Sequence, residues 1–413
     1  MATDGEILAS LFKSALDAAL PDGKFDDILP AQPSGRTIII GAGKGSARMA
    51  AAFEAAWRHP CEGLIVTRYG HGAKTKYIEI VEAAHPVPDQ AGLNAAERIL
   101  ALAQSAGPDD LVVCLMSGGA SALLSLPAPG ITLADKQAIN KALLKSGAPI
   151  GEMNLVRKSL SAIKGGRLAA AIAPAKLVTY LISDVPGDDP AAIGSGPTIP
   201  EASDPERALA ILAQYNIAIE PRIEQAIRNN IITDENAGGE THMLATPRMA
   251  LDAAAEKAHS FGLETRILGD AIEGEARKVA ELMALIVTSV EEHDTPAKRP
   301  CVLLSGGETT VTVKGNGRGG RNAEFLLALL LALGKRPGIS AIACDTDGID
   351  GMETNAGAWF DETLLDRAEA AGLSGLAYLD NNDAYSFFDA LGQLVVTGPT
   401  LTNVNDFRAI IIR

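Results

Sequence analysis

The stretch IIIGAGKGSARMAAAF, residues 38–53, decides the fold class of this chain. Three isoleucines make a short apolar run typical of a buried strand, and the alanine-rich stretch after the glycines is typical of a helix. The glycines of GAGKGS allow the tight turn between them. A strand, a glycine turn and a helix in this order indicate one step of a mostly parallel, helix-covered sheet.

The same alternation extends in both directions. Strands are expected at residues 37–40, 63–67, 77–82, 111–116 and 177–183, and helices at residues 6–19, 46–57, 92–104, 133–144 and 152–173. After a polar segment at residues 234–239, strands are expected at residues 265–268, 301–305 and 340–344, and helices at residues 249–261, 273–290 and 323–333. Residues 301–305 are expected to form a hairpin with residues 310–314, and residues 393–397 to pair with residues 406–412.

The length of 413 residues exceeds what one hydrophobic core supports, so we predict two α/β domains, residues 1–238 and 239–413. The net charge of −15 argues against nucleic acid or an anionic membrane as partner. The N-terminus lacks the features of a signal peptide and no apolar run is long enough to span a bilayer, so a cytoplasmic protein is expected. The four cysteines show no metal-binding spacing. A monomer and a homodimer both remain open.

Positive residues in glycine-rich loops of an acidic protein suggest a small anionic ligand. Lys44 lies inside GAGKGS, at the expected start of a helix where an anion is favoured, and Gly43 allows close backbone approach. The motif is an incomplete dinucleotide fingerprint, because Ser46 replaces its third glycine and no acid ends the next strand. Arg68 at that place leaves NADP binding open. An ordinary solvated turn is the other interpretation.

Two Ser-Gly-Gly turns follow apolar strands. Ser117, Gly118 and Gly119 in MSGGASALL can form a nest of backbone N–H groups for an anion. Ser305 and Gly306 in LSGGET, followed by Glu308, have the same position after a strand, and two such turns suggest two half-sites. A serine nucleophile is a weaker alternative, because the glycine pattern of a hydrolase elbow is absent.

Two further segments carry unbalanced positive charge. In MNLVRKSLSAIKGGRLA a helix would place Asn154, Arg157 and Lys158 on one face, with Lys164 near its end. In GNGRGGRNAEFLLALLL, residues 315–331, Arg318 and Arg321 precede a long apolar run, so they lie at a helix N-terminus suited to phosphate or carboxylate. For each segment taken alone, a solvated face or loop is the simpler explanation.

Clusters of aspartates follow two other strands. The first, SDVPGDDP, holds Asp184 and Asp189, and the second, CDTDGIDG, holds Asp345, Asp347 and Asp350. Carboxylates at strand ends suit Mg²⁺ that is also bound to phosphate oxygens, and one of them could accept a hydroxyl proton. Such clusters also make ordinary turns. The last loop, TGPTLTNVND, offers hydroxyl and amide groups for substrate hydroxyls, notably Asn403.

In this order, the motifs GAGKGS, AAHPVPD, MSGGASALL, MNLVRKSLSAIKGGRLA, SDVPGDDPAAIGSGPT, LSGGET, GGRNAEFLLALLL, DTDGIDG and TGPTLTNVND resemble the D-glycerate 2-kinases that carry a MOFRL domain. The resemblance spans nearly the whole chain. It implies a Rossmann-like N-terminal domain with a mostly parallel sheet, a MOFRL-type α/β C-terminal domain with a mixed sheet, and an active site in the interdomain cleft. It also implies MgATP-dependent phosphorylation of D-glycerate on its 2-hydroxyl. Similar proteins also carry the name hydroxypyruvate reductase.

The resemblance implies that Lys44, Arg321 and Asp347 are catalytic. For the metal ion it suggests Asp184, Asp189 and Asp345. The remaining candidates for binding substrate or nucleotide are Gly43, Ser117, Gly118, Gly119, Asn154, Arg157, Lys164, Ser305, Gly306, Glu308, Arg318 and Asn403. The main alternative is an NAD(P)H-dependent hydroxypyruvate reductase that uses GAGKGS as a dinucleotide turn. A second is a non-catalytic sensor of sugar acids, which would leave the aspartate clusters unexplained.

Overall fold

The computed structural model describes residues 2–232 and 238–413, which divide into two compact units. Unit 1 comprises residues 1–20 and 245–413, and unit 2 comprises residues 21–244. This division differs from the predicted one at the N-terminus, because helix α1 (Asp4–Ala19) belongs to unit 1. The buried face of α1 carries Phe12, whose ring lies 5.6 Å from that of Phe407. The predicted linker at residues 234–239 lies mostly outside the described residues.

Unit 2 contains a six-stranded sheet in the order β3-β2-β1-β4-β5-β6. Its strands are β1 (Thr37–Ala42), β2 (Glu62–Arg68), β3 (Ile78–Ala83), β4 (Leu111–Met116), β5 (Lys176–Ile182) and β6 (Glu240–Ala245). The first five pair in parallel, and β1 and β4 are buried along their whole length. The predicted parallel, helix-covered sheet is confirmed. Its central strands β1 and β4 end in GAGKGS and MSGGAS, which brings these two loops together.

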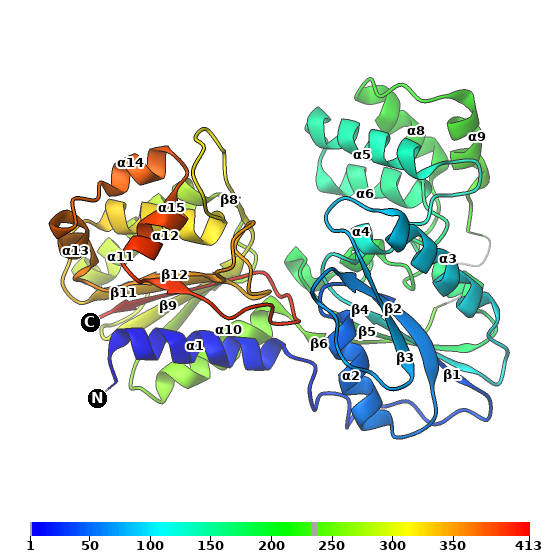
Figure 1. The fold of residues 1–413 in the computed structure, drawn as a ribbon, viewed down its shortest axis with the longest axis horizontal. Helices are drawn as coiled ribbons and strands as arrows, with labels where there is room; N and C mark the ends of the chain where they lie inside the picture. Colours follow the sequence, from blue (N-terminus) through cyan, green and yellow to red (C-terminus); the bar gives the residue numbers. More distant parts are fainter. Residues whose placement is uncertain (1, 233–237) are drawn as a thin grey trace. The chain divides into compact units, whose positions relative to one another are not determined.

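The helices of unit 2 form two groups. Around the sheet lie α2 (Ser46–Trp57), α3 (Gln90–Gln104), α4 (Ala120–Leu123), α7 (Arg167–Ile172) and the short 3₁₀ turns Pro186–Asp188 and Ile193–Ser195. A separate layer with its own apolar core contains α5 (Leu133–Ser146), α6 (Ile150–Ser159), α8 (Pro205–Gln214) and α9 (Pro221–Asn229) (Figure 1).

The single helix predicted over residues 152–173 is wrong. Helix α6 ends at Ser159 and α7 begins at Arg167, with a loop between them. Gly165 and Gly166 have φ angles of 59° and 85°, and a Cβ on Gly166 would lie 2.6 Å from the Cα of Pro200. The left-handed backbone breaks the helix, and Lys164 therefore lies in a loop.

Unit 1 contains a mixed six-stranded sheet in the order β13-β12-β11-β14-β9-β7. Its strands are β7 (Glu264–Gly269), β9 (Cys301–Gly307), β11 (Ile339–Asp345), β12 (Gly357–Phe360), β13 (Leu394–Val395) and β14 (Asp406–Ile412). Strand β14 is antiparallel to both β9 and β11. This register places Asp406 directly opposite Gly307 on one side and Asp345 on the other.

Two predicted strand pairings in unit 1 are wrong. Strand β13 pairs with β12 and not with β14. Strand β10 (Thr309–Thr310) pairs in parallel with β8 (Gly274–Glu275), so no hairpin joins it to β9. In both cases the local strand pattern was present, but packing against more distant segments selected the partner.

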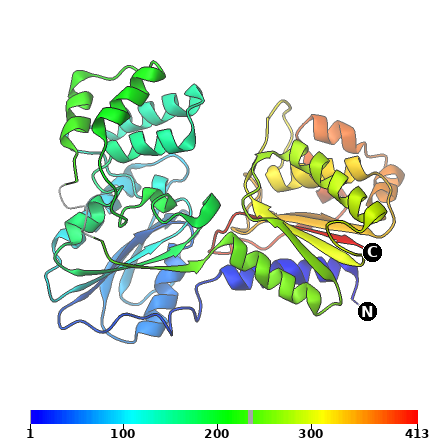
Figure 2. The same ribbon diagram turned by 180° about the vertical axis from the view of Figure 1, so that it is seen from behind.

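Helices cover both faces of the unit 1 sheet. Helices α1 and α10 (Pro247–His259) lie on one face, and α11 (Ala276–His293) and α12 (Arg321–Leu333) lie on the other (Figures 1 and 2). Three short helices complete the layer on the side of α12: α13 (Leu364–Ala370), α14 (Gly375–Asp380) and α15 (Ala384–Ala390). None of the described helices combines the length and the apolar character needed to cross a bilayer.

Candidate functional site

Arg321, the first residue of α12, is held by three carboxylates. Its Nε lies 2.8 Å from Asp406, one terminal nitrogen lies 2.7 Å from Asp345, and the other lies 3.3 Å from Glu308. Burial lowers the pKa of Arg321, but Asp406, Asp345 and Glu308 together raise that pKa above its ordinary value. The guanidinium is therefore permanently charged and held in one orientation.

A second layer of hydrogen bonds fixes the start of α12. The fully buried carboxylate of Asp350 accepts the backbone N–H of Asn322 at 3.0 Å and that of Ala323 at 2.9 Å. The Asn322 amide also donates to Asp406 at 2.8 Å. Burial raises the pKa of Asp350 to about 6, although both backbone N–H groups lower it. The DTDGIDG loop thus caps the helix that carries Arg321, as a distant N-cap.

The turn after β11 presents the aspartates predicted for catalysis and metal binding. Asp345 and Asp347 are both buried, and the backbone N–H of Asp347 donates to the Asp345 carboxylate at 2.9 Å. The Asp347 carboxylate accepts the N–H of Ile349 at 2.9 Å. A buried carboxylate held by a turn in this way has the geometry of a proton acceptor for a bound hydroxyl.

The charges around Arg321 do not balance. Five carboxylates, Glu308, Asp345, Asp347, Asp350 and Asp406, are grouped with only two guanidinium groups, Arg321 and Arg408. The excess of negative charge suits a cation bound together with substrate. Within residues 2–232 and 238–413, however, no three His, Cys, Asp or Glu side chains converge as a preformed metal centre.

Other predicted residues of unit 1 have structural partners. Ser305 lies in β9 opposite Arg408 of β14, beside Gly306. Arg318 is exposed, forms an ion pair with Glu353 and stacks over the ring of Tyr385 at 4.4 Å, and so belongs to a different cluster from Arg321. In the last loop Asn403 is buried, and its side-chain oxygen accepts the N–H of Asn405 at 3.3 Å.

In unit 2 the GAGKGS turn is filled by the neighbouring MSGGAS loop. The N–H of Lys44 donates to Gly118 O at 2.8 Å, and the N–H of Gly45 donates to the Ser117 hydroxyl at 3.0 Å. The N–H of Gly43 donates to Val66 O at 3.0 Å, and a Cβ on Gly43 would lie 2.1 Å from Ser117 Oγ. The glycine therefore serves packing between two loops, and these three N–H groups are not available to a dinucleotide.

The side chain of Lys44 lies at the surface of this double loop. A Cβ on Gly119 would lie 3.4 Å from Lys44 Cγ and 3.0 Å from Nε2 of His85, so all three residues are neighbours. Lys44 is half-buried, whereas Ser117 is fully buried. Within the described chain, the backbone N–H groups of Gly118 and Gly119 have no hydrogen-bond acceptor, which leaves them for an anion.

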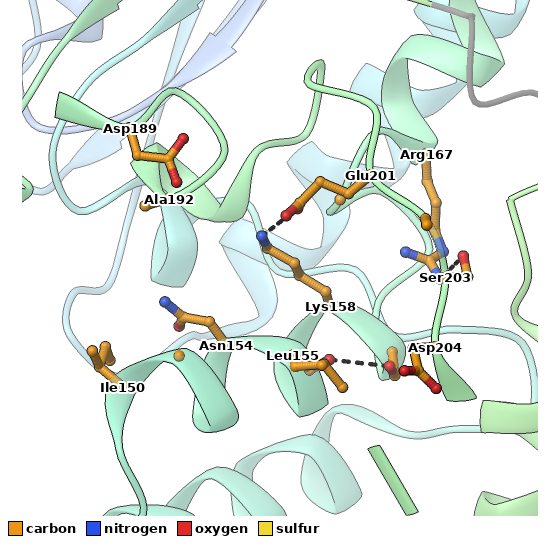
Figure 3. Close-up of a pocket in the computed structure, with 14 residues that line it drawn as sticks. Ile150, Asn154, Leu155, Lys158, Arg167, Asp189, Ala192, Glu201, Ser203 and Asp204 are labelled. Atoms are coloured by element: carbon orange, nitrogen blue, oxygen red, sulfur yellow. Dashed lines mark hydrogen bonds and ion pairs between the residues drawn. The ribbon is translucent and has the colours of Figure 1, made fainter. Parts of the chain in front are cut away.

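A pocket of about 380 Å³ lies between α6 and the loops that follow β5 (Figure 3). Two predicted residues, Asn154 and Asp189, line it together with Lys158 and Arg167. Lys158 reaches from α6 to the carboxylate of Glu201, as the dashed line in Figure 3 shows. Asp189 is exposed and accepts the N–H of Ala191 at 3.0 Å. Apolar and polar side chains of α6 both line this pocket, and no aromatic side chain does.

Two cations predicted to bind substrate are more deeply placed. The amine of Lys164 is buried and donates to the carbonyl and the hydroxyl of Ser121, both at 2.5 Å. Burial lowers the pKa of Lys164 well below its ordinary value, and the neighbouring charges of Lys136, Arg157 and Lys158 lower that pKa further. Arg157 is largely buried and contacts the Asn154 side chain at 3.4 Å.

The roles of three residues were missed by the sequence analysis: Asp406, Asp350 and Lys136. The sequence did not predict that Asp406 pairs with Arg321 or that Asp350 caps the helix of Arg321. Lys136 was not singled out at all. Its signal was present, because Lys136, Ile139 and Leu143 share one face of α5 and the two apolar residues mark that face as inward.

Comparison with known proteins places the chain among relatives of similar length. Residues 7–229 match the model of a domain of unknown function, DUF4147, and residues 301–406 match the MOFRL family. A protein of Agrobacterium vitis, provisionally named hydroxypyruvate reductase, is 52% identical and the match covers 98% of this chain and 94% of that protein. The D-glycerate 2-kinase of Thermotoga maritima is 38% identical, with 97% and 96% covered.

A solved structure gives the same result. The crystal structure of a glycerate kinase from Thermotoga maritima matches with a TM-score of 0.91 at 37% identity, covering 98% of this chain and 99% of that one. The fold, both domain matches and the identity over the full length agree. The chain therefore belongs to the glycerate 2-kinase family that joins a DUF4147 domain to a MOFRL domain.

Proposed function

We propose that this protein transfers the γ-phosphoryl group of ATP to the 2-hydroxyl of D-glycerate, giving 2-phosphoglycerate and ADP. The observation that carries this function is the turn that holds Asp345 and Asp347 beside Arg321. Three carboxylates, Asp345, Asp406 and Glu308, fix the guanidinium of Arg321. Phosphoryl transfer depends on positioned charge and a proton acceptor more than on covalent chemistry by the protein. The relatives named as glycerate kinases support the same reaction.

In unit 1, Asp347 accepts the proton of the glycerate 2-hydroxyl while the hydroxyl oxygen attacks the γ-phosphorus of ATP. The new P–O bond forms while the bond to the β-phosphate oxygen breaks, and ADP leaves with that oxygen. Arg321 neutralises the charge that develops on the transferring group, because its permanent charge and locked orientation need no rearrangement. Ser305, Gly306, Glu308, Arg318 and Asn403 are the proposed binding residues of this unit.

In unit 2, Lys44 is the second proposed cation for the transferring phosphoryl group. The N–H groups of Gly118 and Gly119, which have no acceptor among the described residues, bind phosphate oxygens of ATP, supported by Ser117 and Gly43. Asn154, Arg157 and Lys164 bind the glycerate carboxylate. Proposed catalytic residues are thus present in both units, so both units are needed for turnover.

Magnesium fits the chemistry of the acidic residues. Asp345, Asp184 and Asp189 would supply oxygen ligands, and the surplus of carboxylates around Arg321 would favour a divalent cation. When bound, Mg²⁺ neutralises phosphate oxygens of ATP. Because Asp345 already pairs with Arg321, the ion is expected to be held by few protein ligands and by the phosphates themselves.

Reduction of hydroxypyruvate is the second candidate, and the name of the Agrobacterium vitis relative favours it. The strand order of unit 2 is compatible with a dinucleotide fold. The GAGKGS turn argues against it, because Ser117 and Gly118 already occupy the N–H groups of Gly45 and Lys44. A pyrophosphate could bind there only if the two loops separated.

The test is incubation of the purified protein with D-glycerate and MgATP, with the product identified by its direct conversion by enolase. Enolase accepts 2-phosphoglycerate but not 3-phosphoglycerate without an added mutase, so the assay also gives the position of the phosphate. Oxidation of NADH and NADPH with hydroxypyruvate is measured in parallel. Nicotinamide oxidation without phosphoglycerate would reject the kinase and restore the reductase.

A further inference from the structure

Lys136 is a buried ammonium group without a partner. It lies in the second turn of α5, its residue is 3% exposed, and its Nζ has no hydrogen-bond partner among the described residues. It shares the inward face of α5 with Ile139 and Leu143, so the helix packing holds it inside unit 2. Its neighbour Asp135 lies on the outer side, where it pairs with Arg222 of α9.

The surroundings of Lys136 add positive charge. Arg157 of α6 and Lys164 of the following loop both interact with it electrostatically. Across residues 2–232 and 238–413, no carboxylate lies within ion-pair distance of Lys136, Arg157 or Lys164. The acidic groups near these elements have other partners: Asp135 of α5 pairs with Arg222, Glu152 of α6 pairs with Arg207, and Glu201 pairs with Lys158.

Grouping two buried cations and one partly buried cation without an anion destabilises a protein. Each charge loses its hydration, and their mutual repulsion adds to that cost. Neutral partners relieve Lys164, through Ser121, and in part Arg157, through Asn154, but nothing relieves Lys136. A bound anion would compensate the positive charge of these three residues. The chain has a net charge of −15, so the lack of an acidic residue at this place is not due to a shortage of them.

We propose that Lys136, Arg157 and Lys164 form a subsite for a substrate oxyanion, with Lys136 as the residue whose charge only that oxyanion compensates. Ser121, which accepts from Lys164, stands one turn beyond Ser117-Gly118-Gly119, so the subsite adjoins the proposed nucleotide loop. The proposed function assigns Arg157 and Lys164 to the carboxylate of the acid, and a phosphate of the nucleotide is the other source of such an oxyanion. Assigning it to one of these substrates depends on the proposed function.

Binding at this subsite should take up a proton. Burial and, to a smaller extent, the charge of Arg157 lower the pKa of Lys136 to about 8, so part of the free protein carries a neutral amine near that pH. The charged groups on the surrounding elements include Arg157 and Lys158 of α6, Lys164, the Lys158 partner Glu201, the Asp135–Arg222 pair, and Glu152 of α6 with its partner Arg207 of α8. An incoming oxyanion favours the charged amine and raises the pKa of Lys136.

The experiment compares Lys136→Met, Lys136→Arg and a matched control, Lys141→Met, which changes an exposed lysine on the same helix. D-glycerate, ADP and inorganic phosphate are titrated separately into each protein by calorimetry at pH 8.5, in buffers of different ionisation enthalpy. We expect one probe to bind the wild type and Lys141→Met equally, with proton uptake. Its affinity should fall by at least about tenfold in Lys136→Met, without proton uptake, and recover in part in Lys136→Arg.

Thermal unfolding separates this role from a structural one. Without ligand, Lys136→Met should be as stable as the wild type or more stable, because an uncompensated charge is replaced by an apolar side chain of similar length. The stabilisation by the bound probe should shrink. If Lys136→Met binds all three probes as the wild type does, or if no probe binds the wild type, the subsite is rejected.

The outcomes for the subsite and for the kinase are distinguishable. Phosphorylation of glycerate by a wild type whose ligand affinities do not depend on Lys136 would leave the kinase intact and reject the subsite. Binding of ADP or phosphate that depends on Lys136, in a protein that never phosphorylates glycerate, would support the oxyanion subsite and reject the kinase. A glycerate affinity that alone depends on Lys136 assigns the subsite to the carboxylate.

Discussion

The two units treat buried charge in opposite ways. In unit 1, Arg321 and Arg408 are outnumbered by carboxylates, and each guanidinium pairs with Asp406. In unit 2, Lys136, Arg157 and Lys164 lie together without a carboxylate partner in the described residues. One region thus has surplus negative charge and the other surplus positive charge. The contrast supports the proposal that unit 1 receives a cation and a hydroxyl, and unit 2 anionic groups.

These two cations of unit 1 are surrounded by an excess of carboxylates, and these three cations of unit 2 have no carboxylate partner among the described residues. Mutating them should therefore change stability and ligand binding in different ways. Removing a cation from unit 1 leaves several carboxylates to repel one another, which costs stability. Removing a cation from unit 2 relieves repulsion and costs ligand binding instead. The predictions below test or sharpen this difference, from the largest expected effect to the smallest.

Replacing Arg321 by Ala should abolish most activity and destabilise unit 1. We expect kcat to fall by about 10³-fold or more, because both transition-state charge and site geometry are lost. The free energy of unfolding should fall by about 3–5 kcal/mol, since three carboxylates lose their shared cation. Steady-state kinetics and urea unfolding measure the two effects. The control Arg248→Ala removes an exposed arginine of the same unit and should change neither.

Replacing Asp347 by Asn should affect turnover with little effect on binding. The amide cannot accept the hydroxyl proton, so kcat should fall by about 10²–10⁴-fold while KM for glycerate changes little. Kinetics with saturating MgATP measure both parameters. An exposed aspartate of the same unit, Asp366, provides the control Asp366→Asn. If kcat of Asp347→Asn stays within about threefold of the wild-type value, Asp347 is not the base.

Replacing Gly43 by Ala should destabilise unit 2 without any change of charge. The new Cβ would lie 2.1 Å from Ser117 Oγ at a φ of 139°, so the two loops must separate. We expect a loss of about 1–3 kcal/mol. Trp57 is in unit 2 and Trp359 in unit 1, so Trp57 fluorescence in a Trp359→Phe background reports unit 2. Gly151→Ala, with open space around the new Cβ, should leave stability unchanged or slightly raised.

Asp350 should give unit 1 a stability that declines as pH rises. Its folded-state pKa of about 6 lies above the ordinary 3.8, so between these values the folded protein binds more protons than the unfolded chain. This contribution is fully present below about pH 4 and is lost as pH passes 6. The difference in unfolding free energy between wild type and Asp350→Asn should fall by about 3 kcal/mol over this range. A difference that is constant with pH would show that Asp350 is not the titrating group.

The local pattern of the sequence predicted the elements but not their partners. The strand, turn and helix of residues 38–53 and the strands of the parallel sheet are confirmed, because buried strands and alanine-rich helices have strong periodic signals. The pairing of β13 with β12 and the packing of α1 in unit 1 were missed. Both depend on segments more than a hundred residues away or on short strands with weak patterns.

The candidate site shows the same limit. Positive residues in glycine loops singled out Lys44 and Arg321, whose roles remain predictions, but the partners of Arg321 follow from the register of β14 between β9 and β11. That register puts Asp406 beside Asp345, and no local motif encodes it. Likewise, the glycines of GAGKGS suggested an open anion nest, whereas the neighbouring strand supplies Ser117 to fill it.

The assignment of α1 to unit 1 affects how the chain must fold during synthesis. Helix α1 is synthesised before unit 2, but its packing partners α10, β11 and β14 are all encoded after unit 2. At a synthesis rate of about 5–20 residues per second, the apolar face of α1 waits roughly 10 to 45 seconds while residues 21–244 are made. During that interval, unit 2 can complete its sheet, and α1 is an exposed amphipathic segment that chaperones could bind.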